Sequence, residues 1–178
     1  NQIVSVDLVG AFYYARECGR HMLENGSGSI VNIGSILGSG GSENGVIAYS
    51  AAKGGLRNMT LQLGTEWADR GVRVNAVSPG FIVTEMTRVA LEAMGIDKWI
   101  ASRTPMRRVG ESQEVTNAVM FLASDLASYI TGVDLLVDGG TNAINGSFQI
   151  PPIHHEWNVD TPMIPTSYEP VQPRPDWY

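Results

Sequence analysis

Short apolar runs that alternate with long helical patterns constrain the fold of this chain most. Three runs have the length and composition of buried strands, and they occupy residues 29–33, 73–77 and 134–137. The segments before and between them carry apolar residues at helical spacing, within residues 3–24, 47–70 and 111–123. A helix between consecutive strands predicts parallel βαβ units with helices on both faces of one sheet. The predicted fold class is therefore α/β.

The number of predicted strands is small for an open sheet. Such a sheet usually has about four to six strands, and the first predicted helix begins with the chain. We therefore expect residues 1–146 to be the C-terminal part of an α/β domain whose N-terminal half is absent from this sequence. Residues 1–3 resemble neither a signal peptide nor a usual start.

Composition separates a second region, residues 147–178. Seven of the nine prolines lie there, and its apolar residues follow no period. Proline limits flexibility, so we predict an extended C-terminal arm. Its apolar side chains, which include Trp157 and Trp177, predict that the arm covers part of a neighbouring subunit. Rapid hydrogen exchange throughout 147–178 would contradict this docking.

Charge and cysteine content argue against several partners and compartments. The formal net charge of −6 works against nucleic acid and anionic membranes, which require basic surfaces. The sequence contains no run of about eighteen apolar residues, so no membrane span is predicted. Cys18 is the single cysteine, so a disulfide within the chain is excluded and a cytoplasmic location is expected. His154, His155 and Glu156 do not predict a metal site, because adjacent side chains rarely face one ion and further ligands at useful spacing are lacking.

Candidate catalytic residues lie on and before the second predicted helix. Tyr49 and Lys53 stand four positions apart, so their side chains share one helix face, about 5–6 Å apart at Cβ. A free phenol ionises at about pH 10, and a nearby ammonium favours the phenolate. Tyr49 could then act as a general acid and base near neutral pH. Ser35, at the end of the first predicted strand, could hydrogen-bond the oxygen that exchanges the proton.

Each of these features also has an ordinary structural interpretation. A Tyr-x-x-x-Lys pair is a frequent coincidence on helices, and a serine after a strand is more often a turn residue. Pro79 and Gly80 likewise form an ordinary turn after the second predicted strand. The order of the motifs along the chain favours the functional interpretation.

Four motifs follow one another in the order and spacing of a known family. They are Ile-Val-Asn-Ile-Gly-Ser at 30–35, Tyr-Ser-Ala-Ala-Lys-Gly-Gly at 49–55, Val-Asn-Ala-Val-Ser-Pro-Gly at 74–80 and Gly-Val-Asp-Leu-Leu-Val-Asp-Gly-Gly at 132–140. From residue 3 to about residue 140 the chain resembles the single-domain branch of the short-chain dehydrogenase/reductase family. The resemblance implies a Rossmann-like, doubly wound parallel sheet, of which this chain holds the C-terminal strands and helices.

The resemblance implies an NAD- or NADP-dependent oxidoreductase that interconverts a small-molecule secondary alcohol and a ketone. Ser35 would hold and polarise the substrate oxygen, and Tyr49 would donate or accept the proton. Lys53 would support the Tyr49 phenolate and hydrogen-bond the nicotinamide ribose, so that Tyr49 and Lys53 also border the cofactor. The family's dehalogenase relatives have arginine in place of this lysine, so Lys53 argues against lyase or isomerase chemistry.

The resemblance also implies a cofactor site after the second predicted strand. Pro79 and Gly80 would open the loop under the nicotinamide, and the Ile82 N–H and the Thr84 hydroxyl would reach its carboxamide. The Gly-x-x-x-Gly-x-Gly turn that cradles the pyrophosphate is absent from the sequence, as is the residue that selects NAD or NADP. A companion N-terminal segment or chain is therefore expected to supply both.

One position departs from the family pattern. Many relatives have an asparagine in a segment that resembles residues 6–10, and this chain has Asp7 there. In the family that residue acts through its backbone carbonyl, which holds a water in a proton relay with the lysine. Asp7 is therefore a candidate catalytic residue, and its carboxylate would need a partner if it were buried.

Weaker signals concern assembly and substrate. The second predicted helix carries an additional apolar stripe, formed by Leu56, Met59, Leu63 and Trp67. The resemblance assigns this stripe to packing in a homodimer or homotetramer, and ordinary core packing explains it equally. Residues 83–103 stand where the family has its substrate lid, and the small polar residues of 38–44 favour a hydroxylated substrate.

A non-catalytic subunit or binding module is the alternative to an enzyme. Such a protein would keep the fold without the phosphate-binding loop, since fold alone does not establish function. The presence of Ser35, Tyr49 and Lys53 together favours the enzyme.

Overall fold

The computed structural model describes residues 2–41, 45–85, 87–88 and 96–143, all within the unit Asn1–Gly146. The longer helices are α2 (Ala11–Asn25), α3 (Ile47–Glu66), α5 (Ile96–Arg103) and α6 (Ser112–Ala123). The strands are β1 (Gly28–Ile33), β2 (Val72–Pro79), β3 (Ile82–Val83), β4 (Gly110–Glu111) and β5 (Asp134–Val137). The short helical segments are α1 (Gln2–Val4), η1 (Ser5–Gly10), η2 (Ile36–Gly38), η3 (Ala68–Arg70), η4 (Asp125–Ala127) and η5 (Thr141–Ala143).

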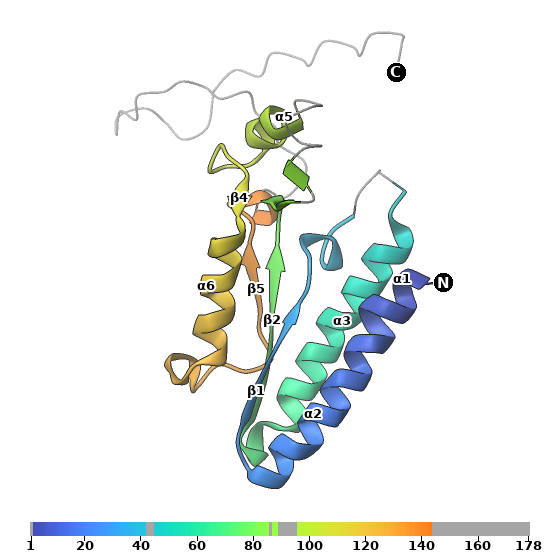
Figure 1. Ribbon diagram of the computed structural model, residues 1–178, viewed down its shortest axis with the longest axis vertical. Coiled ribbons are helices and arrows are strands. Elements are labelled where there is room, and N and C mark those ends of the chain that lie inside the picture. The colour runs from blue at the N-terminus through green and yellow to red at the C-terminus, as the bar shows by residue number, and fades with distance from the viewer. Residues whose placement is uncertain (1, 42–44, 86, 89–95, 144–178) are drawn as a thin grey trace, which may run out of the picture. The chain divides into compact units, whose positions relative to one another are not determined.

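The three predicted strands form one parallel sheet in the order β1–β2–β5 (Figure 1). In its register Gly28 is opposite Val72, and Ala76 is opposite Asp134. The chain passes through α3 between β1 and β2, and through α6 between β2 and β5. The predicted α/β class is therefore confirmed. Strand β2 runs beyond its predicted end to Pro79 because its last residues pair with β5.

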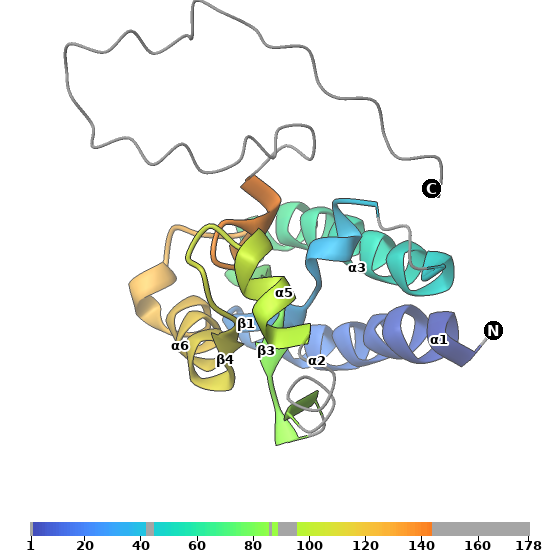
Figure 2. The ribbon, with the colours of Figure 1, turned by 90° about the horizontal axis from the view of Figure 1, so that it is seen from above.

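Helices cover both faces of the sheet, as predicted (Figures 1 and 2). Val72 and Val74 of β2 pack with Trp67 on the face covered by α2 and α3. Val77 of the same strand packs with Leu122 of α6 on the other face. Successive residues of a strand point to opposite faces, so β2 contributes to both hydrophobic cores.

Most of the additional apolar stripe on α3 packs inside this chain. Leu56 and Trp67 are buried, and Leu63 packs against the core that contains Trp67. A side chain at Gly19 of α2 would collide with the Trp67 ring, so glycine is needed where α2 packs on Trp67. Ordinary core packing thus explains these three stripe residues.

The first predicted helix is interrupted, which the apolar spacing did not predict. Residues 3–24 were expected to form one regular helix, whereas Ser5–Gly10 forms a π-helical turn between α1 and α2. The predicted end is confirmed, because Gly26 caps α2 in the left-handed conformation with φ 65°. A π-helical turn adds a residue to the local helical repeat, and such turns are frequent at functional sites.

Helix α3 ends earlier than predicted. We expected it to reach residue 70, but it ends at Glu66 and is followed by η3. The cause is Trp67, whose ring is buried in the core and whose carbonyl accepts hydrogen bonds from the Arg70 and Val72 N–H groups at 3.1 and 3.2 Å. Gly71 then turns the chain into β2 with φ 77°.

The segment after β2 forms a second, two-stranded parallel sheet from β3 and β4. Helix α5 lies within the predicted lid, 83–103, but residues 86 and 89–95 of that region are outside the described residues. The predicted arm, 147–178, is outside them as well. No helix in the described ranges has both the length and the apolar character needed to cross a bilayer.

Candidate active site

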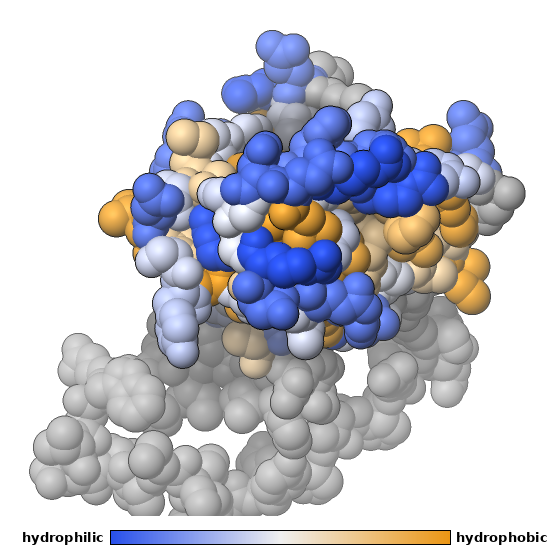
Figure 3. All heavy atoms as spheres, turned by 90° about the horizontal axis from the view of Figure 1, so that it is seen from below, coloured by the Kyte–Doolittle hydropathy of each residue, from blue (hydrophilic) through white to orange (hydrophobic). Residues whose placement is uncertain are grey.

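The strands of the sheet point toward the end at which α3 begins (Figure 1). Ser35 follows β1 by two residues, and Tyr49 and Lys53 are in the first turns of α3. Open α/β sheets bind ligands at the carboxyl ends of their strands. Hydrophilic side chains predominate on the face seen from the opposite end (Figure 3).

Ser35 is held in a position from which it can donate a hydrogen bond. Its backbone is extended, with φ −165° and ψ 151°, and it caps η2. Its Oγ accepts a hydrogen bond from the Leu37 N–H at 3.2 Å, and the residue is buried. An accepting hydroxyl keeps its own hydrogen, so Ser35 can still donate to a substrate oxygen.

Lys53 is tied to its surroundings by several contacts. Its Nζ donates a hydrogen bond to the Ile33 carbonyl at the end of β1, at 3.0 Å. The same atom is 5.6 Å from the centroid of the Tyr49 ring. The Lys53 side chain as a whole is 11% exposed, while its hydrogen bond to Ile33 lies at an exposed position. The structure therefore places the Lys53 charge beside Tyr49, as the four-residue spacing predicts.

Two glycines bring neighbouring segments close to α3 at this point. A side chain at Gly38 of η2 would place its Cβ 2.8 Å from the Lys53 carbonyl oxygen. A side chain at Gly55 would place its Cβ 2.8 Å from a methyl carbon of Leu8 in η1. The loop that carries Ser35 and the π-helical turn that carries Asp7 therefore both pack directly on α3.

Asp7 reaches the same ammonium from the π-helical turn. Its Oδ1 lies 3.6 Å from Lys53 Nζ, and its side chain is 30% exposed. The family resemblance implies that the residue at this position acts through its backbone carbonyl. The structure identifies a charge partner for the carboxylate, while the role of the carbonyl stays a prediction.

Four of the six predicted cofactor contacts line one hollow of about 550 Å³, and the other two, Tyr49 and Lys53, are not among its lining residues. Pro79, Gly80, Ile82 and Thr84 all border it. A side chain at Gly80 would place its Cβ 2.8 Å from the Asp138 Cβ, so glycine is needed where this turn passes the end of β5.

Three hydroxyl residues that the sequence analysis did not select border the same hollow: Thr87, Ser112 and Thr116. Thr87 shapes the loop, because its Oγ1 accepts a hydrogen bond from the Thr84 N–H at 2.8 Å. The Thr-x-x-Thr spacing was a usable signal for Thr87. Ser112 donates to the Val83 carbonyl at 3.0 Å, a contact across 29 positions that local sequence does not reveal.

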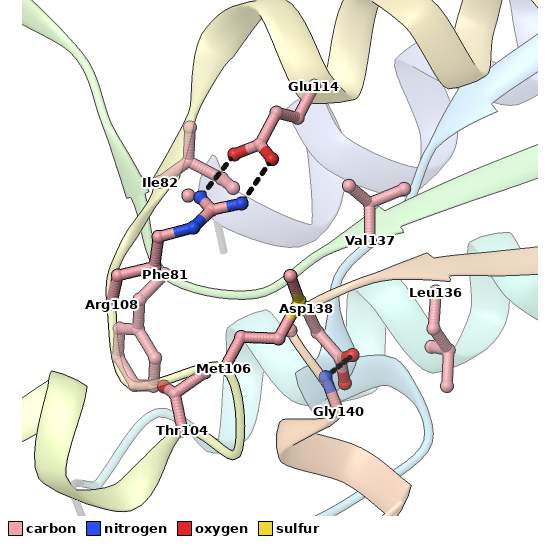
Figure 4. A pocket seen from close by; sticks show the side chains of 12 residues that line it. Phe81, Ile82, Thr104, Met106, Arg108, Glu114, Leu136, Val137, Asp138 and Gly140 are labelled. Carbon is pink, nitrogen blue, oxygen red and sulfur yellow. Dashed lines mark hydrogen bonds and ion pairs between the residues drawn. The ribbon is translucent and has the colours of Figure 1, made fainter.

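A second cavity, of about 300 Å³, lies beside Phe81 and Ile82 (Figure 4). Its charged groups are already satisfied by the protein. Asp138 accepts hydrogen bonds from the Gly140 and Asn142 N–H groups at 2.9 and 2.7 Å. Arg108 and Glu114 form a two-pronged ion pair with distances of 2.7 and 2.6 Å. Ser35, Tyr49 and Lys53 line neither this cavity nor the hollow at the end of β2.

The Arg108–Glu114 pair predicts a defined response to acid. Hydrogen bonds from Arg108 and from the Glu111 N–H lower the pKa of Glu114 from 4.5 to about 2. A carboxyl whose pKa is lower in the folded state stabilises the fold above its ordinary pKa, and this contribution is lost as the pH falls through the folded value. The stability difference between wild type and Glu114→Gln should therefore be constant at neutral pH and shrink between pH 4.5 and about 2.

Denaturant unfolding of both proteins at a series of pH values measures this difference. A difference that stays the same down to pH 2 would show that charge on Glu114 contributes nothing.

Metal-ligating side chains do not gather in the described part of the chain. No group of three His, Cys, Asp or Glu residues there could hold a metal ion. His154 and His155 lie outside the described residues.

Comparison with known proteins identifies the family of this chain. Residues 1–142 match the family model described as enoyl-(acyl carrier protein) reductase. The chain is 44% identical over 140 residues to galactitol 2-dehydrogenase (L-tagatose-forming) of Cereibacter sphaeroides, covering 78% of this chain and 55% of that protein. It is 42% identical over 140 residues to 3-oxoacyl-[acyl-carrier-protein] reductase of Escherichia coli K12, covering 79% and 56%.

Solved structures also match this chain. A gluconate 5-dehydrogenase from Burkholderia cenocepacia J2315, in complex with NADP and tartrate, matches with a TM-score of 0.72 and 34% identity. The match covers 78% of this chain and 54% of that one. These matches define a class of Rossmann-like oxidoreductases. The chain belongs to the short-chain dehydrogenase/reductase family, and it spans about half the length of the relatives that it matches.

Proposed function

We propose that this chain carries the proton-transfer site of an NAD(P)-dependent oxidoreductase that interconverts a secondary alcohol and a ketone. The observation that carries the proposal is the fixed position of Lys53, 3.0 Å from the Ile33 carbonyl and 5.6 Å from the Tyr49 ring. An ammonium beside a phenol favours the phenolate. That pair is suited to general acid–base catalysis near neutral pH.

Each side chain has a defined part in the oxidation direction. Ser35 donates a hydrogen bond to the substrate oxygen, which orients the alcohol toward Tyr49. The Tyr49 phenolate accepts the hydroxyl proton as the carbon–oxygen double bond forms. Lys53 holds its positive charge beside the Tyr49 ring. In the reduction direction Tyr49 returns the proton to the same oxygen.

The hollow at the end of β2 fits a nicotinamide. Apolar side chains such as Ile33 and Ile82 offer contact to a flat ring, and the hydroxyls of Thr84 and Thr87 offer hydrogen bonds at its edge. When bound, NAD or NADP supplies the acceptor or donor of the hydride. Pro79, Gly80, Ile82 and Thr84 would hold the nicotinamide end, with Tyr49 and Lys53 beside its ribose.

We extend the proposal to a small hydroxylated substrate. In the loop after β1, Ser39 Oγ accepts a hydrogen bond at 2.8 Å from the Asn142 Nδ2, which ties this polar loop to the segment after β5. Two of the similar proteins are named for galactitol and gluconate. Reduction of a 3-oxoacyl group is the second candidate, because the reductase of that name is 42% identical.

Turnover assays on the full-length protein distinguish these possibilities. The protein would be incubated with NAD or NADP and a panel of polyols, sugar acids and hydroxyacyl thioesters, and reduced nicotinamide would be followed by absorbance. Activity on polyols or sugar acids supports the proposal, and activity confined to thioesters supports the second candidate. Tight cofactor binding without turnover would instead favour a binding module.

Assembly is also a proposal. The helices of the first segment expose Val6, Tyr13 and Tyr14, and α6 and the segment after it expose Met120 and Tyr129. Apolar side chains exposed in such numbers usually pack against a partner. We expect a homodimer or homotetramer, completed by a companion N-terminal segment, and native mass spectrometry of the full-length protein tests this.

A further inference from the structure

Three elements converge on the ammonium of Lys53. Strand β1 offers the Ile33 carbonyl at 3.0 Å, α3 offers the Tyr49 ring, and η1 offers the Asp7 carboxylate at 3.6 Å. Asp7 is the one charged residue in η1, and neither β1 nor η2 contains a charged residue. The next charged residue on α3, Arg57, is paired with Asp134 at 3.2 Å.

Helix α2 also carries charged side chains. The charged side chains of α2 form pairs among themselves, Arg16 and Arg20 with Glu17, and His21 with Glu24. Within the described residues, Asp7 is therefore the carboxylate whose ion pair reaches Lys53.

We infer that the Asp7 carboxylate is the counter-charge of Lys53 and moderates the positive field that Lys53 exerts on Tyr49. Asp7 acts through Lys53 and does not touch the reacting atoms, so it is a positioning residue. This inference rests on the proposed function. It differs from the backbone-carbonyl role, because a carbonyl carries no net charge and survives any substitution of the side chain.

The surroundings make the charge of Asp7 effective. Lys53 is 11% exposed and Asp7 is 30% exposed, and partly buried pairs are screened less than pairs in open water. Leu8 packs closely on Gly55 and fixes η1 against α3. The Asp7 carboxylate is therefore held near Lys53 by packed structure. Asparagine has the same shape and can still accept a hydrogen bond. The substitution Asp7→Asn therefore removes charge while preserving size.

The test compares the pH dependence of alcohol oxidation in wild type and Asp7→Asn, using the full-length protein. Without the counter-charge, Lys53 should favour the Tyr49 phenolate more strongly. The acidic limb of the rate profile is then expected to move to lower pH by about 0.5–1 unit. At neutral pH the rate should be similar or modestly higher. Raised salt should reduce the displacement, because ions screen the pair.

Glu24→Gln is the matched control. It removes one negative charge from α2 at an exposed site paired with His21, so the profile should coincide with that of wild type. Coincident profiles for Asp7→Asn and wild type would overturn the inference. A uniform loss of rate at every pH, with an unmoved limb, would show a purely structural role and would overturn it as well.

A second measurement does not depend on turnover. Ultraviolet titration detects tyrosinate directly, and subtracting the titration of a Tyr49→Phe partner isolates Tyr49 in each background. The Tyr49 signal should appear at lower pH in Asp7→Asn than in wild type. If wild type shows no turnover but the titration moves as expected, the proposed function fails while the counter-charge stands. An unmoved titration refutes the counter-charge whether or not the protein is active.

Discussion

Replacing Tyr49 by phenylalanine should abolish turnover in the full-length protein. The substitution removes one hydroxyl group and leaves the ring in place, so Lys53 keeps its hydrogen bond to the Ile33 carbonyl. General acid–base catalysis by a positioned side chain contributes a factor of about 10²–10⁴, and kcat should fall by that factor. Cofactor affinity, measured by the fluorescence of reduced nicotinamide, should stay close to that of wild type.

Tyr129→Phe provides the control for loss of a hydroxyl. Tyr129 is fully exposed beyond α6, so its substitution should leave kcat unchanged. A residual kcat for Tyr49→Phe above about one tenth of the wild-type value is too high for a lost general acid. That outcome would assign proton transfer to another group, and Ser35 would be the next residue to substitute.

Gly64→Ala should destabilise the protein markedly, although alanine normally favours a helix. Gly64 is buried in α3, and an added Cβ would lie 2.5 Å from the Gly132 nitrogen and 2.8 Å from the Val74 carbonyl oxygen. Both neighbours are main chain and are joined by a 2.8 Å hydrogen bond, so neither can move aside alone. We expect a loss of about 1–3 kcal/mol from overpacking, against a gain of about 1 kcal/mol from helix propensity.

Urea unfolding of the full-length protein measures the change. Gly10→Ala is the matched control, because Gly10 has helical backbone angles and an added Cβ would meet its nearest neighbour at 3.5 Å. That variant should be as stable as wild type or slightly more stable. Equal stability of the Gly64 and Gly10 variants would mean that α3 moves away from the sheet at little cost.

The strands and the proximity of Tyr49 to Lys53 were predictable because their signals are local. Apolar runs of strand length locate β1, β2 and β5 to within two residues at each end. The four-residue spacing of Tyr49 and Lys53 brings them together wherever a helix forms. The structure confirms that proximity with a 5.6 Å separation of Lys53 Nζ and the ring.

Features that depend on distant residues were not predictable. The π-helical turn packs on Gly55 of a later helix, and apolar spacing alone does not distinguish it from a regular helix. The early end of α3 follows from the burial of Trp67 against β2 and α2. Ser112 borders the hollow at the end of β2 because α6 begins directly after β4. In each case contacts between residues far apart in the sequence determine the local structure.

Main-chain contacts help to position helix α3 at two places along its length. Gly38 meets the Lys53 carbonyl at one end, and Gly64 meets the Gly132 main chain at the other. Ile47, at the start of α3, is 83% exposed and contributes little to this packing. An exposed residue such as Ile47 can therefore be exchanged without moving α3, which makes this end of the helix tolerant of sequence change.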